Sequence, residues 1–396
     1  MSNSLALRFL NVAHFLDHFF LLVFPTAVLA IHVEWGMSYA DTLALATPAF
    51  VLFALATYPC GWLGDRWGGV PMMRLFFLGL GAASVATGFA EGPLSLSLGL
   101  AAIGLFAAIY HPVATAMVVQ LAERPGRELG INGVWGNLGV ALAAAITAGL
   151  TAWAGWRMAF LVPGAVTLAL GVAYLLFSRR PVATAAGGRG AERKSFSMDP
   201  RDQRRVFFVV AVSALLGGLV FNGVTIALPK LFEERLDVEA LGLVGVGAVT
   251  TGVFLAASFT QLFTGSLIDR LGPRPLLLAG LGLQAPLLLL LGLLGGAAVV
   301  PPAVPLMLVV FGVIPVSSWL LGRYVAPEWR SRAYGLQFLL ALGVNAFVVP
   351  MISGLHAGTG GSAALFVLMA AMAALQFLAA LVLPGRRPAP LAPAAA

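Results

Sequence analysis

Apolar residues occur in this chain as long, nearly uninterrupted runs separated by short polar segments. Each run is about as long as the roughly 20 residues that a helix needs to cross the hydrocarbon core of a bilayer. The pattern therefore predicts membrane-spanning helices, six in each half of the chain. The twelve predicted crossings are 9–32, 43–62, 72–91, 94–121, 129–152 and 157–177, followed by 206–229, 240–263, 274–297, 301–324, 332–356 and 362–383.

The polar segments divide the chain into two similar parts. Residues 1–177 and 206–383 are each predicted to form a six-helix bundle, and residues 178–205 connect them. This connection holds eight Lys and Arg residues against three acidic ones and is rich in Gly and Ala, so it cannot bury a core and is predicted to be a mobile basic linker. The tail 384–396 is rich in Pro and Ala and is predicted to be disordered.

Composition identifies the solvent of these helices. The chain is 60% hydrophobic and 10% charged, with a mean hydropathy of +0.95. Soluble domains carry roughly 25% charged residues. The predicted fold class is therefore an all-α polytopic membrane protein, with the lipid bilayer as its surroundings. The single cysteine, Cys60, excludes an intrachain disulfide and a cluster of thiolate metal ligands.

The positions of the basic residues predict the orientation. Twenty of the 23 Lys and Arg residues lie in the N-terminal segment, the even-to-odd connections, the middle linker and the C-terminal tail. Basic residues stay on the cytoplasmic side of an energised membrane, so both termini are predicted to be cytoplasmic, in the inner membrane of a bacterium. The net charge of +7 reflects this bias. Because these residues are scattered over short loops, they do not indicate a nucleic-acid partner. The chain is expected to be monomeric.

One charged motif occurs twice. Residues 61–68 and 265–272 both read G-x-x-x-D-R-x-G, and the second copy follows the first by 204 residues. Pro112 and Pro315 stand in the fourth and tenth predicted helices at an offset of 203 and are expected to break them. Three anchors with nearly one offset, the third being the pair Arg127 and Arg332, predict two parallel repeats, which is the plan of a secondary transporter.

The repeated motif has a mechanical interpretation. A carboxylate at one helix end can face the partial positive charge of a neighbouring helix N-terminus, and glycine lets the two backbones approach. Asp65 and Asp269 would then latch the cytoplasmic ends of the helices that start near Arg332 and Arg127. The alternative is that these are only charges that set the topology. The predicted gate comprises Gly61, Asp65, Arg66, Gly68, Gly265, Asp269, Arg270, Gly272, Arg127 and Arg332.

Ionisable residues interrupt the first apolar run. His14, Asp17 and His18 are spaced i, i+3 and i+4, so they share one face of the predicted helix 9–32. With a rise of about 1.5 Å per residue, Asp17 lies about 13 Å from the cytoplasmic end and His111 about 15 Å from it. Asn137 reaches a similar depth on the fifth helix. Such groups are costly in lipid, so they are predicted to form a cluster that faces water, a ligand or each other.

Four roles remain open for this cluster. Asp17 could exchange a proton between access states, with His14, His18 or His111 tuning it. The imidazoles could bind an anionic substrate, or the cluster could bind a divalent metal ion as cargo. The group could also be structural and hold the first helix against the fourth. No resident metal is predicted, because the layer offers no further carboxylate to complete a ligand shell.

The second half offers only neutral polar residues within its predicted crossings. Phe221 and Asn222 on the seventh helix are the preferred candidates for substrate contact, with Ser317 and Ser318 on the tenth. Singly, each is also compatible with an interhelical hydrogen bond. The contrast predicts that coupling chemistry belongs to the first half, and that the second half shapes a cavity for a small, partly apolar organic molecule.

These motifs resemble those of the major facilitator superfamily, and the likeness covers about residues 9–383. The two G-x-x-x-D-R-x-G hairpins resemble that family's loop between helices 2 and 3, and Gly155–Phe160 resembles its turn between helices 5 and 6. Within the superfamily, Gly104–Ala114 is similar to the fosmidomycin-resistance-like exporters. The resemblance implies two six-helix bundles that work by alternating access.

Other classes of protein fit less well. The chain contains no His-Glu-x-x-His motif, no P-loop and no nucleophile elbow, so it is predicted not to be an enzyme and to need no cofactor. The predicted function is secondary active transport of a small organic molecule, coupled to protons. The alternatives are a transporter of divalent metal or organic anions that uses His14, Asp17 and His18 as ligands, and a membrane receptor that does not transport.

Overall fold

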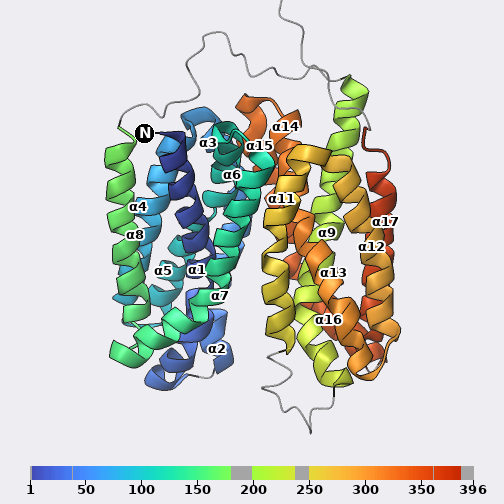
Figure 1. The fold of residues 1–396 in the computed structure, drawn as a ribbon. Coiled ribbons are helices and arrows are strands. Elements are labelled where there is room, and N and C mark those ends of the chain that lie inside the picture. Colours follow the sequence, from blue (N-terminus) through green and yellow to red (C-terminus); the bar gives the residue numbers. More distant parts are fainter. Residues whose placement is uncertain (1, 38, 180–198, 237–248, 360, 385–396) are drawn as a thin grey trace, which may run out of the picture. The chain divides into compact units, whose positions relative to one another are not determined.

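The computed structural model describes residues 2–37, 39–179, 199–236, 249–359 and 361–384. Within these ranges the regular elements are helices, and no strand occurs (Figure 1). The chain divides into two compact units. Unit 1 comprises residues 1–123, 131–191 and 325–339, and unit 2 comprises 124–130, 192–324 and 340–396. The predicted boundaries at 177 and 206 remain a prediction, and most of the predicted linker and tail lies outside the described residues.

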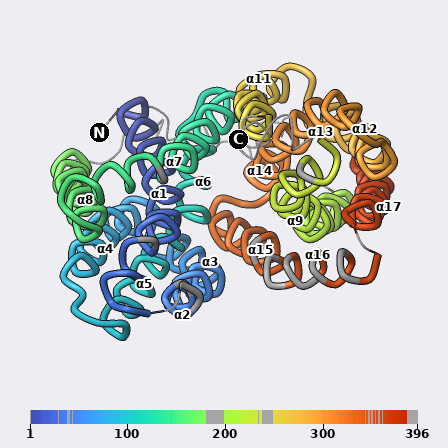
Figure 2. The backbone as a smooth tube through the Cα atoms, turned by 90° about the horizontal axis from the view of Figure 1, so that it is seen from below, coloured from blue at the N-terminus to red at the C-terminus, as the bar shows by residue number. Residues whose placement is uncertain are grey.

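The first half of the chain supplies most of unit 1. Its helices are α1 (Asn3–Trp35), α2 (Tyr39–Ala44), α3 (Thr47–Trp67), α4 (Gly69–Gly88), α5 (Pro93–Ala107), α6 (Tyr110–Leu121), α7 (Pro125–Ala154) and α8 (Met158–Phe177). Within this unit α4 packs along α8, and α1 lies beside α6 (Figure 2).

The second half has a similar series of helices. They are α9 (Pro200–Arg235), α11 (Thr260–Leu271), α12 (Pro273–Leu293), the 3-10 turn η1 (Gly296–Val299), α13 (Val300–Gly312), α14 (Ile314–Tyr324), the 3-10 turn η2 (Pro327–Trp329), α15 (Arg330–Gly343), α16 (Asn345–Thr359) and α17 (Ala363–Ala380). Within unit 2, α12 packs along α17, and α17 packs along α9.

Ten of the twelve predicted crossings overlap a candidate membrane span of the described part. Ten helices of the described part are long and apolar enough to cross a membrane. The crossing predicted at 43–62 coincides with α3, whose apolar run is diluted by Thr57, Tyr58 and Pro59. The crossing predicted at 332–356 is divided into α15 and α16 by a turn at Val344. Residues 240–248 of the eighth predicted crossing lie outside the described residues.

Two of the predicted crossings are broken ahead of a proline. The fourth is divided into α5 and α6 at Ala108 and Ile109, and the tenth is divided into α13 and α14 at Val313. Proline lacks an amide hydrogen, and its ring clashes with the carbonyl one turn earlier, so the break comes before Pro112 and Pro315 rather than at them. The first break places His111 in the first turn of α6.

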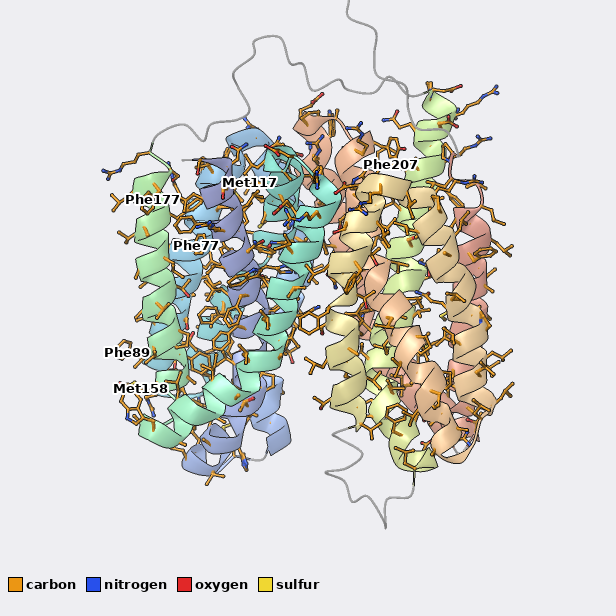
Figure 3. All side chains as sticks on the ribbon, in the orientation of Figure 1. Phe77, Phe89, Met117, Met158, Phe177 and Phe207 are labelled. Carbon is orange, nitrogen blue, oxygen red and sulfur yellow. The ribbon has the colours of Figure 1, made fainter. Side chains whose placement is uncertain are left out.

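Apolar side chains lie both inside each unit and on its outside. In unit 1 the buried Phe77 ring packs edge-on to Phe9, and Tyr174 lies beside both. In contrast, Phe89 and Phe177 point outward and are 69% and 53% exposed (Figure 3). Apolar surface of this extent is unusual in a soluble protein and is expected of helices that face lipid.

Candidate functional site

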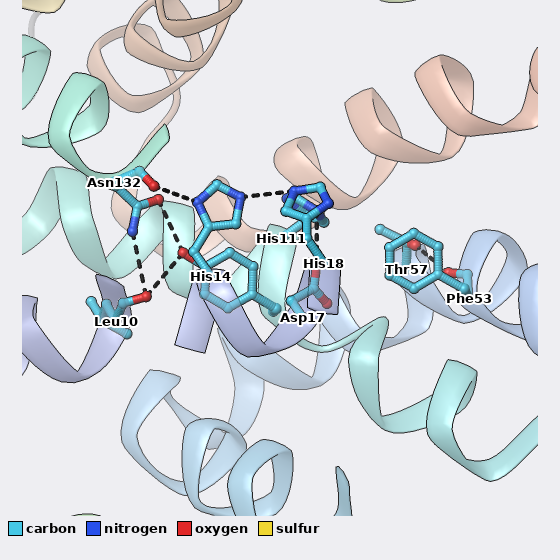
Figure 4. A network of polar contacts seen from close by, with 9 residues as sticks. Leu10, His14, Asp17, His18, Phe53, Thr57, His111 and Asn132 are labelled. Atoms are coloured by element: carbon cyan, nitrogen blue, oxygen red, sulfur yellow. Dashed lines mark hydrogen bonds and ion pairs between the residues drawn. The ribbon is translucent and has the colours of Figure 1, made fainter. Parts of the chain in front are cut away.

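The predicted cluster on α1 is assembled as its helical spacing requires. His14, Asp17 and His18 lie on one face of α1, and His111 approaches them from the first turn of α6 (Figure 4). One ring nitrogen from each of the three histidines lies within 4.8 Å of the other two. Asp17 is 0% exposed, while His14 and His18 are partly exposed. We refer to these four residues as the histidine–aspartate cluster.

A carboxylate without hydrogen bonds lies at the centre of this cluster. His111 Nε2 lies 3.1 Å from Asp17 Oδ2, which is an ion-pair distance. The direction does not meet the geometry of a hydrogen bond, and neither Asp17 oxygen has such a partner among the described residues. A buried carboxylate in this situation is strongly disfavoured as a lone anion, so its charge depends on a proton or on the imidazole beside it.

The other two imidazoles interact with each other. His18 Nε2 lies 3.2 Å from His14 Nε2, and His14 Nδ1 lies 2.7 Å from the carbonyl oxygen of Asn132 on α7 (Figure 4). The His14 ring also stacks on Tyr110, with centroids 4.7 Å apart. These contacts fix the His14 ring on both edges and one face.

Asn132 extends this polar network towards the start of α1. Its Nδ2 donates to Asn11 Oδ1 over 2.9 Å, and the Tyr110 hydroxyl lies 3.0 Å from Asn132 Oδ1 and 3.1 Å from the carbonyl oxygen of Leu10. All three polar side chains are buried. The network therefore ties α1, α6 and α7 together one turn away from the histidine–aspartate cluster.

Glycines on α7 allow this close packing. A Cβ atom added to Gly136 would lie 2.6 Å from His14 Nε2, and one added to Gly139 would lie 2.3 Å from the carbonyl oxygen of Phe15. Neither distance is compatible with an alanine in the present arrangement. The approach of α7 to α1 thus requires glycine at both positions.

Two aromatic rings pack near the His111 side of the cluster. The His111 ring lies against Phe338 of α15, with centroids 4.5 Å apart, and Phe53 of α3 lies 6.1 Å away. The cluster is therefore in contact with a polar network on one side and with two apolar rings on another. Three elements other than α1 and α6 contribute to it.

Asp65 holds the first turn of α15 within unit 1. Its Oδ1 accepts a hydrogen bond from the Ser331 amide over 2.8 Å, and its Oδ2 accepts one from the Arg332 amide over 3.0 Å. The Arg332 Nε donates to the same Oδ2 over 2.9 Å. The Asp65 side chain is only 3% exposed. We call this set of contacts the Asp65 latch.

Asp269 makes the corresponding contacts within unit 2. Its two oxygens accept hydrogen bonds from the amides of Gly126 and Arg127, each over 3.0 Å, at the first turn of α7. The Arg127 guanidinium instead lies 3.5 Å from the carboxylate of Glu128. We call this the Asp269 latch. The contacts between carboxylate and helix N-terminus that the motif predicted are present in both copies.

The glycines of the motif make these contacts possible. A Cβ atom at Gly61 would lie 2.4 Å from the carbonyl oxygen of Ser331, and one at Gly265 would lie 2.3 Å from that of Gly126. The last glycines of the motif, Gly68 and Gly272, have φ angles of 88° and 84° between consecutive helices. Side chains disfavour this conformation, so glycine is required at the turn. Arg66 and Arg270 occupy the last turns of α3 and α11.

The two candidates on α9 contact other residues of unit 2. Asn222 Nδ2 donates to the carbonyl oxygen of Gly218 one turn earlier on α9, and Phe221 packs against Phe311 with centroids 5.3 Å apart. Ser318 on α14 is buried and Ser317 is partly buried. Asn137 is partly buried on α7. A role for these residues in substrate contact stays a prediction.

Several residues of the site were not predicted. Asn132 contacts His14 through its backbone carbonyl, and a backbone contact leaves no mark on the sequence. Tyr110 precedes His111 and could have been found by extending the polar layer by one residue. Phe338 lies in the second half of the sequence, and the repeat pattern gives no signal for its ring contact with His111.

Comparison with known proteins identifies the class. The family model of the Major Facilitator Superfamily matches residues 10–249, so the chain belongs to this superfamily of membrane transporters and is not an enzyme. The structure of the superfamily transporter FucP aligns with a TM-score of 0.72 at 15% identity, covering 96% of this chain and 99% of that one.

Curated relatives of the chain are also transporters. The probable sulfoacetate transporter SauU of Cupriavidus necator is 26% identical over 385 residues, which is 85% of this chain and 87% of that protein. The probable 4-methylmuconolactone transporter of Cupriavidus pinatubonensis is 27% identical over 281 residues, covering 66% of this chain and 62% of that protein. The chain is therefore a multi-pass membrane transporter of the superfamily.

Proposed function

We propose that this chain is a secondary transporter that moves a small organic anion by alternating access and couples the movement to protons. The histidine–aspartate cluster would be the coupling site. The observation that carries the proposal is the complete burial of Asp17 beside His111 Nε2, 3.1 Å away. We also propose a location in the inner membrane of a bacterium, with both termini cytoplasmic, on the distribution of basic residues.

The Asp17–His111 contact supports proton coupling because the pair can hold one proton more or one fewer. With a proton on the imidazole and none on the carboxylate, the pair is an ion pair. With one proton fewer on the pair, the buried carboxylate faces a neutral ring, and its charge is stabilised less. A buried group of this kind is a site where a proton can be taken up on one side of the membrane and released on the other.

Three imidazoles beside a partly exposed surface support an anionic substrate. Among the described contacts of the cluster, Asp17 is the single carboxylate, and a proton added to one of the three imidazoles would supply a positive charge. The names of the relatives add support, since sulfoacetate is a small anion. Phe221 and Asn222 of unit 2 remain candidates for substrate contact on the basis of the sequence.

Uptake into proteoliposomes tests this function directly. The purified full chain would be supplied with an imposed pH gradient and a panel of labelled acetate, lactate, malonate and sulfoacetate. We expect accumulation of at least one of these anions when the gradient is present and none above equilibrium when it is collapsed. Asp17→Asn should abolish gradient-driven accumulation but spare exchange down the anion's own gradient, because the amide cannot exchange the proton.

A matched control is an acidic residue outside the cluster. Glu123 is exposed in the connection between α6 and α7, so Glu123→Gln should leave accumulation unchanged. Accumulation of anion against its gradient by Asp17→Asn would show that this carboxylate does not couple transport. Accumulation of Mn²⁺ or Zn²⁺ with no uptake of any carboxylate would make a divalent cation the cargo. Binding without movement of any panel member would make the chain a receptor.

A further inference from the structure

The contacts of His14 fix where its ring carries a proton. Its Nδ1 lies 2.7 Å from the Asn132 carbonyl oxygen, and a carbonyl oxygen can only accept a hydrogen bond. The His14 proton is therefore on Nδ1. In the neutral ring, the other nitrogen, Nε2, is then a bare acceptor.

The proton position of His18 follows from that of His14. His18 Nε2 lies 3.2 Å from the bare His14 Nε2, and two lone pairs would repel at this distance. His18 therefore carries its proton on Nε2 and donates it to His14. Its Nδ1 is then bare in the neutral ring, and no hydrogen bond to this atom occurs among the described residues.

The same reasoning applies to His111. Its Nε2 faces the Asp17 carboxylate at 3.1 Å, so a neutral His111 beside an ionised Asp17 carries its proton on Nε2 and leaves Nδ1 bare. In the neutral cluster the N–H groups of His14 and His18 are thus directed at the Asn132 carbonyl and at His14, and that of His111 lies beside Asp17. The two nitrogens left over, Nδ1 of His18 and Nδ1 of His111, are both acceptors.

This arrangement cannot bind an anion as it stands. Carboxylate and sulfonate oxygens only accept hydrogen bonds, and so do the two bare nitrogens. A proton added to one of them would create both a donor and a positive charge, which together give a charge-assisted hydrogen bond.

Of the two nitrogens, His18 Nδ1 is the better site. His18 is partly exposed, whereas the His111 side chain is only 11% exposed and lies against Phe338. A proton on His111 would also be neutralised by Asp17, so little charge would remain for a ligand. A proton on His18 Nδ1 leaves its contact with His14 intact, because that contact uses Nε2.

We propose that His18 takes up a proton on Nδ1 from the aqueous side before the substrate binds, and that a carboxylate or sulfonate oxygen then accepts this N–H. Binding of one anion would therefore be accompanied by the uptake of about one proton. One N–H bond forms on His18 before the anion binds, and when the anion departs this bond breaks and the proton returns to water. The inference rests on the proposed organic-anion function and adds the binding atom and the order of binding.

Among the described residues, the titratable groups with contacts to the cluster come from α1 and α6, and neutral residues contact it from α3, α7 and α15. The titratable groups are His14, Asp17, Tyr110 and His111, and the neutral ones are Phe53 of α3, Asn132 and Gly136 of α7, and Phe338 of α15. The Tyr110 hydroxyl is engaged with Asn132 and Leu10.

Calorimetric titration of the purified full chain tests the proposal. The panel member that binds most tightly is titrated at one pH in two buffers that differ in ionisation enthalpy. The difference in measured heat gives the number of protons taken up per anion. We expect about one proton per anion, and an affinity that weakens by up to about tenfold per pH unit as the pH rises.

Two substitutions at His18 separate its two nitrogens. His18→Asn places an amide near the position of Nδ1, so the anion should still bind, but with no proton uptake and little dependence on pH. His18→Gln places its amide near Nε2, which retains a partner for His14 and removes the Nδ1 site. It should weaken binding by about tenfold to a hundredfold, as expected for loss of a charge-assisted hydrogen bond.

His32→Asn is the matched control, because His32 lies near the other end of α1 and outside the candidate span Asn3–Val28. It should bind with the affinity and proton uptake of the wild type. Binding without proton uptake by the wild type, or unchanged binding by His18→Gln, would overturn the inference. The proposed function would survive that result if Asp17→Asn still abolished gradient-driven accumulation. If no panel member binds at all, the anion site and the proposed substrate class both fall.

Discussion

The two latches share their backbone contacts but differ in their side chains. In each, a carboxylate accepts hydrogen bonds from two successive amides at a helix N-terminus. The Asp65 latch adds a third hydrogen bond from Arg332, whose guanidinium also stacks on Trp329, 3.7 Å from the ring centroid. In the Asp269 latch the equivalent Arg127 is directed to Glu128. The two copies of the motif thus share the hydrogen bonds between carboxylate and backbone amides, which depend on glycine and aspartate. They differ in the contacts of the arginine side chain.

This difference predicts which latch holds its helix more firmly. Asp65 is nearly buried and is bonded to a charged donor, so its loss removes more energy than the loss of Asp269. Surface pairs such as Arg127 with Glu128 contribute little, about 0–1 kcal/mol. Substitution of the motif glycines should therefore affect both latches alike, while substitution of the arginines should affect only the Asp65 latch.

Loss of the motif glycines should have the largest effect. Gly61→Ala and Gly265→Ala each place a Cβ atom within 2.4 Å of a carbonyl oxygen of the partner helix, so the helices must separate. We expect transport to fall by more than about tenfold in each variant, because the latch that contains the substituted glycine can then not form. Initial uptake rates in proteoliposomes measure this.

The control for this prediction lies on α7. A Cβ atom on Gly149 would meet nothing within 4 Å, so Gly149→Ala should transport at the rate of the wild type. Normal uptake by either motif variant would mean that the helices can move apart without consequence.

Loss of the carboxylate charge should distinguish the two latches. Asp65→Asn and Asp269→Asn should both slow transport and favour opening at the end predicted to be cytoplasmic, with the larger effect at Asp65. Hydrogen exchange followed by mass spectrometry measures this, since the amides of Ser331 and Arg332 donate to Asp65 and those of Gly126 and Arg127 donate to Asp269. Faster exchange should appear only at the partner helix of the substituted residue. Unchanged exchange and turnover in both variants would leave these residues as topological charges.

The sequence predicted the latches and the cluster on α1 because both depend on local spacing. The i, i+3 and i+4 positions of His14, Asp17 and His18 fix a common face on any helix. The contact partners of the latch residues could be predicted only where the two halves of the sequence repeat each other. The helices that meet Asp65 and Asp269 follow from the common offset, but the departure of Arg127 from Asp269 depends on a single neighbouring residue, Glu128.

The contact of His14 with the backbone of α7 was not predicted. Asn132 holds His14 by its carbonyl oxygen, and any residue at that position would offer the same atom. What the sequence does show there is Gly136, one turn further along, where a side chain would collide with the His14 ring. A glycine that faces a polar cluster was thus an available signal that was not used. Asn137 was predicted to belong to the site only because its depth in the membrane is similar to that of Asp17 and His111.

Removal of the arginine side chains should have a moderate effect on one latch and none on the other. Arg332→Gln removes the hydrogen bond to Asp65 and the contact with Trp329, so transport should fall severalfold and exchange of the Ser331 amide should quicken. Arg127→Gln breaks only an exposed pair and should transport at the wild-type rate. Equal effects of the two substitutions would contradict the difference between the latches.

The smallest effect is expected at the C-terminal ends of α1 and α9, where a glutamate of each unit accepts hydrogen bonds. Glu34 accepts hydrogen bonds from Arg157 and Trp156, each over 2.8 Å, while Glu234 accepts from the amide and hydroxyl of Ser362. The Arg157 guanidinium lowers the pKa of Glu34 from its ordinary value of 4.5. The ionised carboxylate therefore stabilises the folded state above about pH 4.5, and this contribution is lost as the pH falls through the lowered pKa.

Glu34→Gln should accordingly reduce stability slightly near pH 7, by less than about 1 kcal/mol because the side chain is nearly half exposed. The difference from the wild type should shrink to nothing in acid, well below the ordinary pKa. In Glu234→Gln the amide oxygen can still accept from the Ser362 amide, so any loss there should depend less on pH. Thermal unfolding of the purified proteins in detergent at neutral and acidic pH measures both differences. A Glu34→Gln deficit that is equally large in acid would show that Arg157 does not hold this carboxylate through its charge.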